Sequence, residues 1–499
     1  MSAVLSLSGW KSRADGLSFP TQAFIDGRYV EAASGKTFEC VSPIDGRVLT
    51  RVSECDAEDI DRAVKAARRS FDSGAWSQMA PAHRKRVLLG FSALIRENIE
   101  ELALLETLDM GKPIRDALAV DIPGSARCIA WYAEAIDKMY DEVAPTDKSA
   151  LALITREPLG VVGAVVPWNF PLMMAAWKLG PALATGNSVV LKPAEQSPLT
   201  ALRIAALAME AGLPEGVLNV VPGFGETAGQ ALGRHDDVDA VAFTGSAEVG
   251  KLFLKYSGES NMKQVSLECG GKTPNIIMAD APDLEAASQA AADAIFFNQG
   301  EVCNAGSRLI VDRQVKELVV EKVMDAARAR QPGDPLDPNT VMGAMVDEIQ
   351  MKRVLDYIAS GSEGGARIRI GGKRVRQDTG GYYIEPTIFD DVDNDMRIAR
   401  EEIFGPVLSV LSVDHLDEAL AIGNKSDYGL AAAVWTRDIS KAHKAARALR
   451  AGTVWVNCFD HGDISVPFGG FKQSGFGRDK SLHAMEKYTQ LKSTWIHLG

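Results

Sequence analysis

Short apolar runs alternate with helical patterns from Leu159 to Tyr256, and this alternation restricts the fold more than any other feature of the chain. We expect strands over 160–166, 188–191, 217–221 and 239–243, and helices over 172–184, 199–211, 225–232 and 247–256. Strands that alternate with helices form βαβ units, and these units build a largely parallel sheet with helices on both faces. The pattern therefore predicts an α/β domain.

A second alternating series follows a glycine-rich stretch at 268–272. Its expected elements are 275–278, 307–311, 317–329, 405–413 and 430–435. We interpret 268–272 as a hinge between two α/β domains and expect the ligand cleft along their seam. Residues 64–136 have helical periodicity, and the glycine-rich region 361–381 is predicted as a surface hairpin because no helix follows its glycines.

Composition narrows the class of protein. The 499 residues exceed one ordinary core, and 46% hydrophobic with 24% charged residues is typical of a soluble globular protein. The net charge of −12 argues against nucleic acid or an anionic membrane as the main partner. Six cysteines without a CxxC pair, and no apolar leader at the N-terminus, favour a cytoplasmic protein with reduced thiols.

Three residues are candidates for covalent chemistry. Cys303 follows a helix-like stretch that breaks at Gly300; nearby N–H groups can lower a thiol pKa there, although a lone cysteine is more often structural. Glu268 lies in an apolar run before paired glycines, where burial would raise its pKa and suit a general base. Asn169, between two prolines, is either an oxyanion donor or a turn residue.

Three segments compete as dinucleotide signals. Residues 223–229 resemble a GxGxxG fingerprint with its last glycine one place late, and a simple turn explains them equally well. Residues 243–250 follow a strand and open a helix, so Ser246 is placed to donate to a phosphate. Lys192 and Glu195 follow a strand end, where they either bind ribose hydroxyls or form a solvated pair.

The chain resembles the aldehyde dehydrogenase superfamily from Phe24 to about Trp495. The motifs that carry the resemblance are PWNFP at 167–171, LKPAEQSP at 191–198, FTGSAEVG at 243–250, LECGGK at 267–272, FFNQGEVCNAGSR at 296–308, EEIFGPV at 401–407 and PFGGFKQSGFGRD at 467–479. Two departures are Cys269, where Leu or Met is more frequent, and Glu301, where Gln is usual. A carboxylate two residues from Cys303 would raise the pKa of the thiol.

The resemblance implies a mechanism and its residues. Cys303 would attack an aldehyde, the Asn169 amide and the Cys303 N–H would hold the oxyanion, and Glu268 would activate water to hydrolyse the thioester; Lys178 would organise the site. NAD is the implied cofactor, and no metal is expected. The implied cofactor-binding residues are Val166, Pro167, Trp168, Lys192, Glu195, Gly225, Phe243, Gly245, Ser246, Val249, Gln350, Lys352, Glu402 and Phe404.

Finer resemblance concerns bacterial dehydrogenases of polyamine breakdown, which act on 4-(γ-glutamylamino)butanal, 4-guanidinobutanal and related aminoaldehydes. The segments 121–138, 457–470 and 476–489 carry it. The implied tunnel is lined by Phe170, Met173, Trp177, Phe297, Val302 and Phe468, with Asp121, Asp460 and Asp463 near its mouth. The aromatic lining also suits an arylacetaldehyde such as indole-3-acetaldehyde, which stays as the alternative.

Two other enzyme classes would use a reactive cysteine. A CoA-acylating semialdehyde dehydrogenase is disfavoured because Glu268 would activate water to hydrolyse the thioester, and a thiol hydrolase is disfavoured because no motif places a histidine beside Cys303.

For architecture we expect a Rossmann-like NAD-binding domain at 1–139 and 159–270 and a second α/β catalytic domain at 271–474. A small β oligomerisation element at 140–158 and 475–499 would pair with another subunit, in a homodimer or homotetramer.

Overall fold

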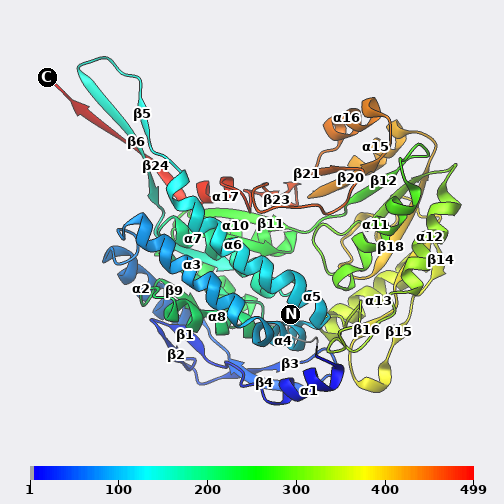
Figure 1. The fold of residues 1–499 in the computed structure, drawn as a ribbon, viewed down its shortest axis with the longest axis horizontal. Helices are drawn as coiled ribbons and strands as arrows, with labels where there is room; N and C mark the ends of the chain where they lie inside the picture. Colours follow the sequence, from blue (N-terminus) through cyan, green and yellow to red (C-terminus); the bar gives the residue numbers. More distant parts are fainter. Residues whose placement is uncertain (1–4) are drawn as a thin grey trace.

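The computed structural model describes residues 5–499 and contains two α/β bodies, with an antiparallel β element that projects from the first body (Figure 1). Residues 1–4 of the expected first domain lie outside the described residues. Within the described part of the chain, no helix is both long and apolar enough to cross a membrane.

The first body is built on an eight-stranded sheet whose five central strands are parallel, as the alternating pattern predicted. In spatial order its strands are β2 (Arg28–Val30), β1 (Ala23–Ile25), β9 (Leu218–Val220), β8 (Ser188–Lys192), β7 (Val161–Val165), β10 (Ala240–Gly245), β11 (Gln264–Cys269) and β23 (Gly475–Phe476). The chain runs outward from β7 through β8 to β9, then returns to the other side of β7 as β10. Ligands of open α/β sheets bind at such a switch point, outside the carboxyl ends of the strands.

Helices cover both faces of this sheet because successive side chains of a strand point in opposite directions. Val161 and Val165 pack with one set of helices, and Val162 and Ala164 pack with the other. The first set is α2 (Ala57–Asp72), α9 (Gln230–Arg234) and α10 (Ala247–Gly258), and the second is α3 (Pro81–Glu97), α4 (Ile99–Met110), α6 (Ile122–Ala135), α7 (Pro171–Ala184) and α8 (Leu199–Glu210). The helix expected at 225–232 is a π-helical turn, Gly225–Gly229, that continues into α9.

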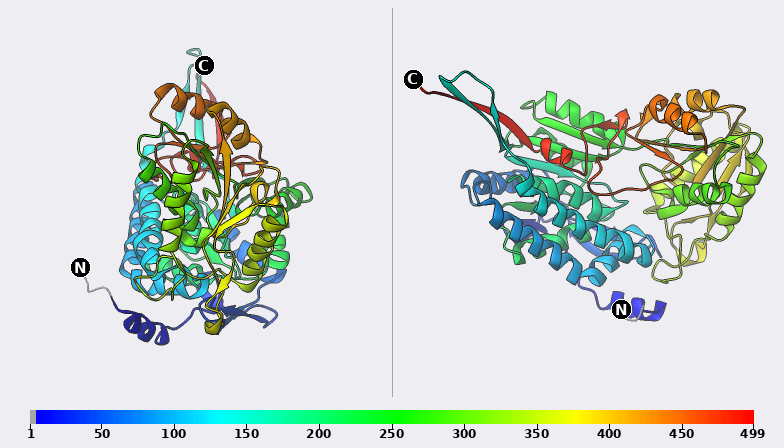
Figure 2. Two further views of the ribbon diagram at one scale, coloured as in Figure 1. Left: turned by 90° about the vertical axis from the view of Figure 1, so that its right-hand side faces the viewer. Right: turned by 45° about the horizontal axis from the view of Figure 1, so that its top comes forward.

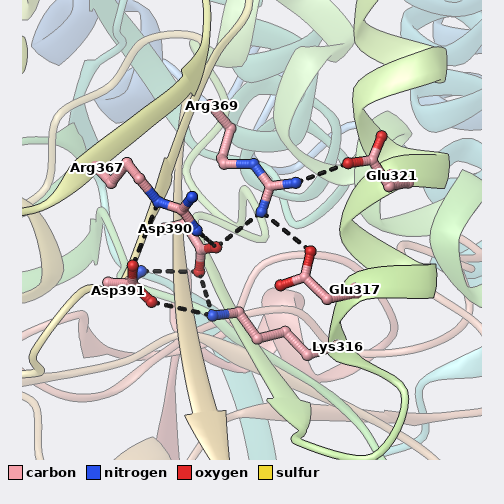
Figure 3. Close-up of polar contacts among 7 residues, drawn as sticks. All are labelled: Lys316, Glu317, Glu321, Arg367, Arg369, Asp390 and Asp391. Carbon is pink, nitrogen blue, oxygen red and sulfur yellow. Dashed lines mark hydrogen bonds and ion pairs between the residues drawn. The ribbon is translucent and has the colours of Figure 1, made fainter.

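The second body has a seven-stranded sheet in which only the edge strand β14 is antiparallel. Its order is β14 (Arg367–Ile370), β17 (Thr387–Asp390), β18 (Val407–Val413), β13 (Arg308–Asp312), β12 (Pro274–Ile277), β20 (Ala431–Trp435) and β21 (Thr453–Val456). Helices α11 (Leu284–Phe296) and α12 (Lys316–Arg328) share one core cluster, and α13 (Glu348–Glu363), α15 (Leu416–Asn424) and α16 (Ile439–Ala448) share another. Ion pairs around Asp390 tie β14 to β17 and α12 (Figure 3).

The third sheet, in the order β24 (Thr489–His497), β6 (Ala150–Pro158) and β5 (Glu142–Ala144), extends away from both bodies and carries the C-terminus (Figure 2). Its expected start at 475 is too early, because β23 pairs with β11 and α17 (His483–Glu486) packs against α7. Residues 475–488 therefore belong to the first body. The remaining short elements are α1 (Leu7–Asp15), β3 (Thr37–Val41), β4 (Val48–Ser53), α5 (Ile114–Asp116), β15 (Arg374–Val375), β16 (Tyr383–Ile384), α14 (Arg397–Arg400), β19 (Tyr428–Gly429) and β22 (Phe471–Lys472).

The glycine-rich segment 361–381 contributes to two structures. Its first part forms β14, and its second part forms an antiparallel hairpin in which β15 pairs with β16. The hairpin prediction is confirmed for the second part alone, since β14 pairs with β17 instead.

Candidate active site

A cavity of about 600 Å³ lies where the two bodies meet. The first body contributes residues that follow the carboxyl ends of β7, β10 and β11, and the second contributes the loops at 297–304, 402–404 and 460–468. This is the expected switch-point position, next to the 268–272 link between the two sheets.

The loop before Cys303 has an unusual backbone. Asn298 and Gln299 have φ angles of 47° and 56°, and Gly300 follows with φ 74°. A side chain at Gly300 would collide with the Gly405 carbonyl, since a Cβ there would lie 2.3 Å from that oxygen. Residues held in this left-handed region cluster at functional sites, because surrounding contacts must hold them there.

Asn169 supplies part of that support. Its Nδ2 donates to the Glu301 carbonyl at 2.8 Å, and the Asn298 amide donates to the Asn169 carbonyl at 3.1 Å. An asparagine amide has two N–H donors, so one remains for a ligand in the cavity that Asn169 lines. Asn169 thus holds the loop that carries Cys303 and keeps one N–H donor for a ligand of the cavity.

The Cys303 thiol is half-buried and faces the cavity. Its pKa is raised well above the ordinary value, first by burial and then by the carboxylates of Glu268, Glu402 and Asp460. The Asn304 N–H lowers this pKa, but the other effects outweigh it, so the expected thiolate is not stabilised by the loop alone. The thiol needs an acceptor for its proton before it can attack.

Glu268, at the end of β11, is 4% exposed, and its Oε1 has no hydrogen-bond partner among the described residues. Burial raises its pKa to about 8; Asp479 adds to this rise, while Lys178 and Lys487 oppose it. A carboxyl group with a pKa near the working pH is suited to accept and release a proton. The burial predicted from its apolar neighbours is present.

Asp479 connects two lysines beside Glu268. Lys178 Nζ of α7 lies 2.5 Å from one Asp479 oxygen, and Lys487 pairs with the other. Burial raises the pKa of Asp479, but the two lysines outweigh it and hold the pKa below its usual range. The backbones of Asp479 and Phe468 exchange two hydrogen bonds of 2.7 Å, which attach this group to the cavity wall. Of these residues, the sequence predicted Lys178 as a site residue and missed the roles of Asp479 and Lys487.

Half of the predicted cofactor-binding residues line the cavity: Pro167, Trp168, Gly245, Ser246, Gln350, Glu402 and Phe404. The Ser246 hydroxyl accepts from the Val249 N–H at 3.2 Å and begins α10. Gln350 donates to the Phe404 carbonyl at 2.7 Å, and the Phe404 ring meets Trp168 edge-on.

The other predicted cofactor-binding residues, Val166, Lys192, Glu195, Gly225, Phe243, Val249 and Lys352, do not line the cavity. Lys192 and Glu195 pair at 2.9 Å beyond the end of β8, and the Val166 N–H donates to the Lys192 carbonyl. Phe243 packs in the core against Phe253, and Lys352 is solvent-exposed and paired with Glu348. These residues lie outside the cavity itself, so a dinucleotide would have to extend beyond it to reach Lys192 and Glu195.

The residues around 244–246 and 402 fit a dinucleotide. Among residues 5–499, Thr244 Oγ1 is buried without a partner, and the start of α10 beside it still offers N–H groups to an anion. The Glu402 carboxylate lies against Gly270, where a Cβ would be 1.9 Å from its oxygen, and burial raises the pKa of Glu402 to about 7. A phosphate group would find donors at one end of this region, and hydroxyl groups would find an acceptor at the other.

The six residues predicted for the substrate tunnel all line the cavity: Phe170, Met173, Trp177, Phe297, Val302 and Phe468. The Phe170 ring stacks on the Phe297 ring with 6.3 Å between their centres, and the Trp177 and Phe468 rings meet edge-on at 5.4 Å. We call these four rings the aromatic wall. Asp460 and Asp463 line it as well, and Asn304 donates to Asp460 at 2.7 Å.

Asp121 is a wrong prediction, because it does not reach the cavity. Its side chain is fully buried and pairs with Lys112, which also contacts Glu106 at 3.2 Å. The π-helical turn at Ala117–Asp121 directs it into the first body. The Lys112 ammonium lies 4.1 Å from the Phe170 ring centre, so this ion group supports the aromatic wall from behind.

Glu301 is also turned away from Cys303. Its Oε1 accepts from the Val346 N–H at 3.1 Å, and burial raises the pKa of its carboxyl group well above the ordinary value. It is absent from the groups that raise the Cys303 pKa, so the expected effect on the thiol does not arise from this geometry. Cavity residues that the sequence missed include Arg127, Arg353, His461 and Lys480.

Comparison with known proteins agrees with the site. The aldehyde dehydrogenase family profile matches residues 29–494. The Escherichia coli NADP/NAD-dependent aldehyde dehydrogenase PuuC is 54% identical over 99% of each chain. A crystal structure of indole-3-acetaldehyde dehydrogenase with NAD+ is 63% identical, covers 99% of this chain and 100% of its own, and has a TM-score of 0.99. That of γ-glutamyl-γ-aminobutyraldehyde dehydrogenase from Burkholderia cenocepacia is 59% identical with the same coverage and a TM-score of 0.98. The chain belongs to the aldehyde dehydrogenase family.

Proposed function

We propose that the protein oxidises an aldehyde to its carboxylic acid through a covalent adduct on Cys303, with NAD as cofactor. The observation that carries this proposal is one cavity containing an accessible thiol, a buried carboxyl group with a pKa of about 8 and a free amide donor. Bound NAD supplies the hydride acceptor. The NAD+ in the indole-3-acetaldehyde dehydrogenase structure supports this choice, as does the fit of residues 244–246 and 402.

The chain's own residues divide the work. Cys303 Sγ passes its proton to the basic form of Glu268, which releases it to solvent, and sulfur bonds to the aldehyde carbon. The remaining Asn169 N–H and the Cys303 N–H stabilise the oxygen that becomes negative. Once the adduct is a thioester, Glu268 takes a proton from water, the hydroxide oxygen bonds to the carbon, and sulfur leaves as the Cys303 thiolate. The proton on Glu268 then returns to solvent. Burial raises the pKa of Glu268 most, and Asp479, Lys178 and Lys487 adjust its protonation equilibrium.

NAD rather than NADP is proposed because Glu195 lies beside Lys192 beyond β8. A carboxylate near the ribose accepts hydrogen bonds from its hydroxyls and repels an added 2′-phosphate. PuuC is described as using both cofactors, so a measured preference decides how strongly Glu195 acts in this chain.

For the substrate we propose an ω-amino, γ-glutamylamino or guanidino aldehyde of polyamine catabolism. Asp460 and Asp463 in the cavity support a cationic group, and relatives described as acting on γ-glutamyl-γ-aminobutyraldehyde and aminoacetaldehyde are 59% and 49% identical. The aromatic wall favours an arylacetaldehyde as the second candidate, and the 63% identity to indole-3-acetaldehyde dehydrogenase supports it. CoA-acylating chemistry ranks below both because Glu268 is placed to activate water.

The central test is Cys303→Ala, which should reduce NADH formation by about 10⁴-fold or more while NAD binding persists. Substantial NADH formation by this variant would overturn the mechanism. Comparison of kcat/KM for 4-(γ-glutamylamino)butanal, 4-guanidinobutanal and indole-3-acetaldehyde, each with NAD and NADP, tests the substrate. A hundredfold preference for the aryl aldehyde would replace the polyamine proposal by its alternative.

Architecture and assembly extend the proposal. Residues 5–139 and 159–270 would bind NAD and 271–474 would carry the nucleophile, with 475–488 added to the first unit. β24 is an edge strand with exposed Leu491, Trp495 and Ile496, so the projecting sheet would pair with another subunit in a homodimer or homotetramer. The molar mass in solution, measured by light scattering, tests this.

The free thiols of all six cysteines support a reducing compartment such as the cytoplasm.

A further inference from the structure

One stretch of the cavity lining is charged, and we call Asp460, Asp463 and Lys480 the charged wall. Asp460 and Lys480 have φ angles of 53° and 61°, and Ser481 has 53°. Non-glycine residues avoid this region unless contacts hold them in it. The fold therefore keeps both ends of the charged wall in unfavourable backbone conformations, a cost that is typical of ligand-binding positions.

The Lys480 ammonium has no hydrogen-bond acceptor and no carboxylate within 4 Å among residues 5–499. It lies 5.5 Å from the centre of the Trp177 ring, and 3.2 Å from the position that a Cβ at Gly462 would occupy. Trp177 and Gly462 both line the cavity. Three N–H donors are thus held beside the aromatic wall without a partner.

Three other lysines near the cavity are paired, and Lys272, whose Nζ is buried without a partner among the described residues, does not line the cavity. Lys178 and Lys487 are paired with Asp479, and Lys112 is paired with Glu106 and Asp121. Burial lowers the pKa of Lys480, whereas Asp460 and Asp463 act against this lowering and favour the protonated amine. Arg127 also lines the cavity, but it is solvent-exposed, where charge interactions are weakened by water and salt.

The position of the charged wall relates it to the far end of a substrate. When the aldehyde carbon is bonded to Cys303, the rest of the substrate extends along the aromatic wall. Trp177 in this wall contacts Lys480. Asp463 is solvent-exposed, so the charged wall faces the open side of the cavity. Asp460 has one oxygen occupied by Asn304 and one available to a donor.

We propose that Lys480 binds a carboxylate at the far end of the aldehyde, and that Asp460 binds an ammonium group of the same end. The substrate class is then an aldehyde whose tail ends in an amino-acid head with both charges. This inference rests on the proposed function and selects one of its substrates, the γ-glutamylamino aldehyde. A tail that carries only a guanidinium or ammonium group would be repelled by the positive charge of Lys480. A neutral aromatic tail uses neither charged residue.

The test compares wild type with Lys480→Met and Lys480→Arg on three aldehydes: 4-(γ-glutamylamino)butanal, 4-guanidinobutanal and hexanal. Hydrogen bonds to charged groups are worth enough to change affinity about ten- to hundredfold. For Lys480→Met we expect the kcat/KM ratio of the γ-glutamyl aldehyde to hexanal to fall by about that factor, mainly through KM. The ratio of the guanidino aldehyde to hexanal should rise, and Lys480→Arg should retain most of the γ-glutamyl preference.

Lys65→Met is the matched control, since Lys65 lies on α2 outside the cavity and its removal changes the net charge equally. An equal loss on all three aldehydes, or no change in either ratio, would overturn the role of Lys480. The proposed function fails separately if wild type forms NADH from none of the three aldehydes, and its polyamine substrate fails if wild type prefers indole-3-acetaldehyde a hundredfold. If indole-3-acetaldehyde is preferred, the kcat/KM ratios of the γ-glutamyl and guanidino aldehydes to hexanal still test the role of Lys480.

Discussion

Two aspartates of this molecule, Asp390 and Asp479, are almost completely buried and contact several cations, yet their surroundings differ. Asp390, at the outer edge of the second sheet, contacts Lys316 at 2.7 Å and Arg367 and Arg369 at 3.0 Å (Figure 3). The carboxylate of Asp479, beside the cavity, pairs with two cations of the described residues, Lys178 and Lys487.

The difference lies in what else the cations touch. Around Asp390 they also pair with Glu317, Glu321 and Asp391, so positive and negative groups alternate outward to solvent (Figure 3). Around Asp479 two lysines share one carboxylate, and the next acid is Glu268, whose Oε1 has no partner. In the Asp390 cluster positive and negative charges balance, and the cluster joins strands and a helix. In the Asp479 cluster positive charge is in excess, and it acts on the protonation of Glu268. We therefore expect the Asp390 cluster to govern stability and the Asp479 cluster to govern pH dependence.

The largest expected effect on the rate comes from replacing Glu268, the acid beside the Asp479 cluster. Glu268→Gln removes the base and should lower the steady-state rate by about 10²–10³-fold. Because the pKa of Glu268 is raised to about 8, its basic form appears as the pH rises, so the wild-type rate should increase through about pH 8. The rate of the variant should lack this increase. A pH profile of kcat for both proteins checks the prediction, and an unchanged rise in the variant would assign it to another group.

A smaller effect is expected from Lys487→Met. Lys487 lowers the pKa of Glu268, so its removal should raise that pKa and move the rate increase to higher pH. A shift of one pH unit would lower the rate at pH 7.5 by about tenfold. The control is Lys316→Met in the Asp390 cluster, which should leave the pH profile unchanged. If both variants shift the profile equally, the distinction between the clusters is lost.

The smallest effect on activity is expected from Asp390→Asn. This change leaves Lys316, Arg367 and Arg369 without their shared charge and should destabilise the fold by about 3 kcal/mol. Since Asp390 lies on β17 rather than in the cavity, kcat/KM should stay within about twofold of wild type. Urea unfolding and steady-state kinetics measure the two quantities. A large loss of kcat/KM in folded protein would contradict the purely structural role of this cluster.

Much of the fold and the site follows from local patterns in the sequence. Alternating apolar runs predicted the parallel strands because burial of both sheet faces leaves a continuous apolar signature. Cys303, Glu268 and Asn169 stand beside glycines and prolines that shape their loops, and the structure brings all three to one cavity. The family resemblance implied the location of all six tunnel residues, and three of them, Phe170, Phe297 and Val302, also stand in the motifs that contain Asn169 and Cys303.

The remaining features depend on contacts between distant segments. The pKa of Cys303 is raised first by burial and then by Glu268, Glu402 and Asp460, and no local pattern contains all four residues. Asp121 was assigned to the mouth, but one π-helical turn rotates it inward to Lys112. Lys480 escaped notice because its direction depends on a left-handed backbone conformation, which composition and periodicity do not indicate.

The paired hydrogen bonds between Phe468 and Asp479 have a consequence for enzyme engineering and for divergence within the family. Phe468 lines the cavity and Asp479 lies beside Glu268, so the shape of the cavity and the charge next to Glu268 are coupled through one hydrogen-bonded backbone bridge. A substitution that enlarges the channel by moving the backbone at 468 displaces the aspartate as well. New substrates obtained in this way should arrive together with altered pH optima, whereas changes at Trp177, on a separate helix, leave the two traits independent.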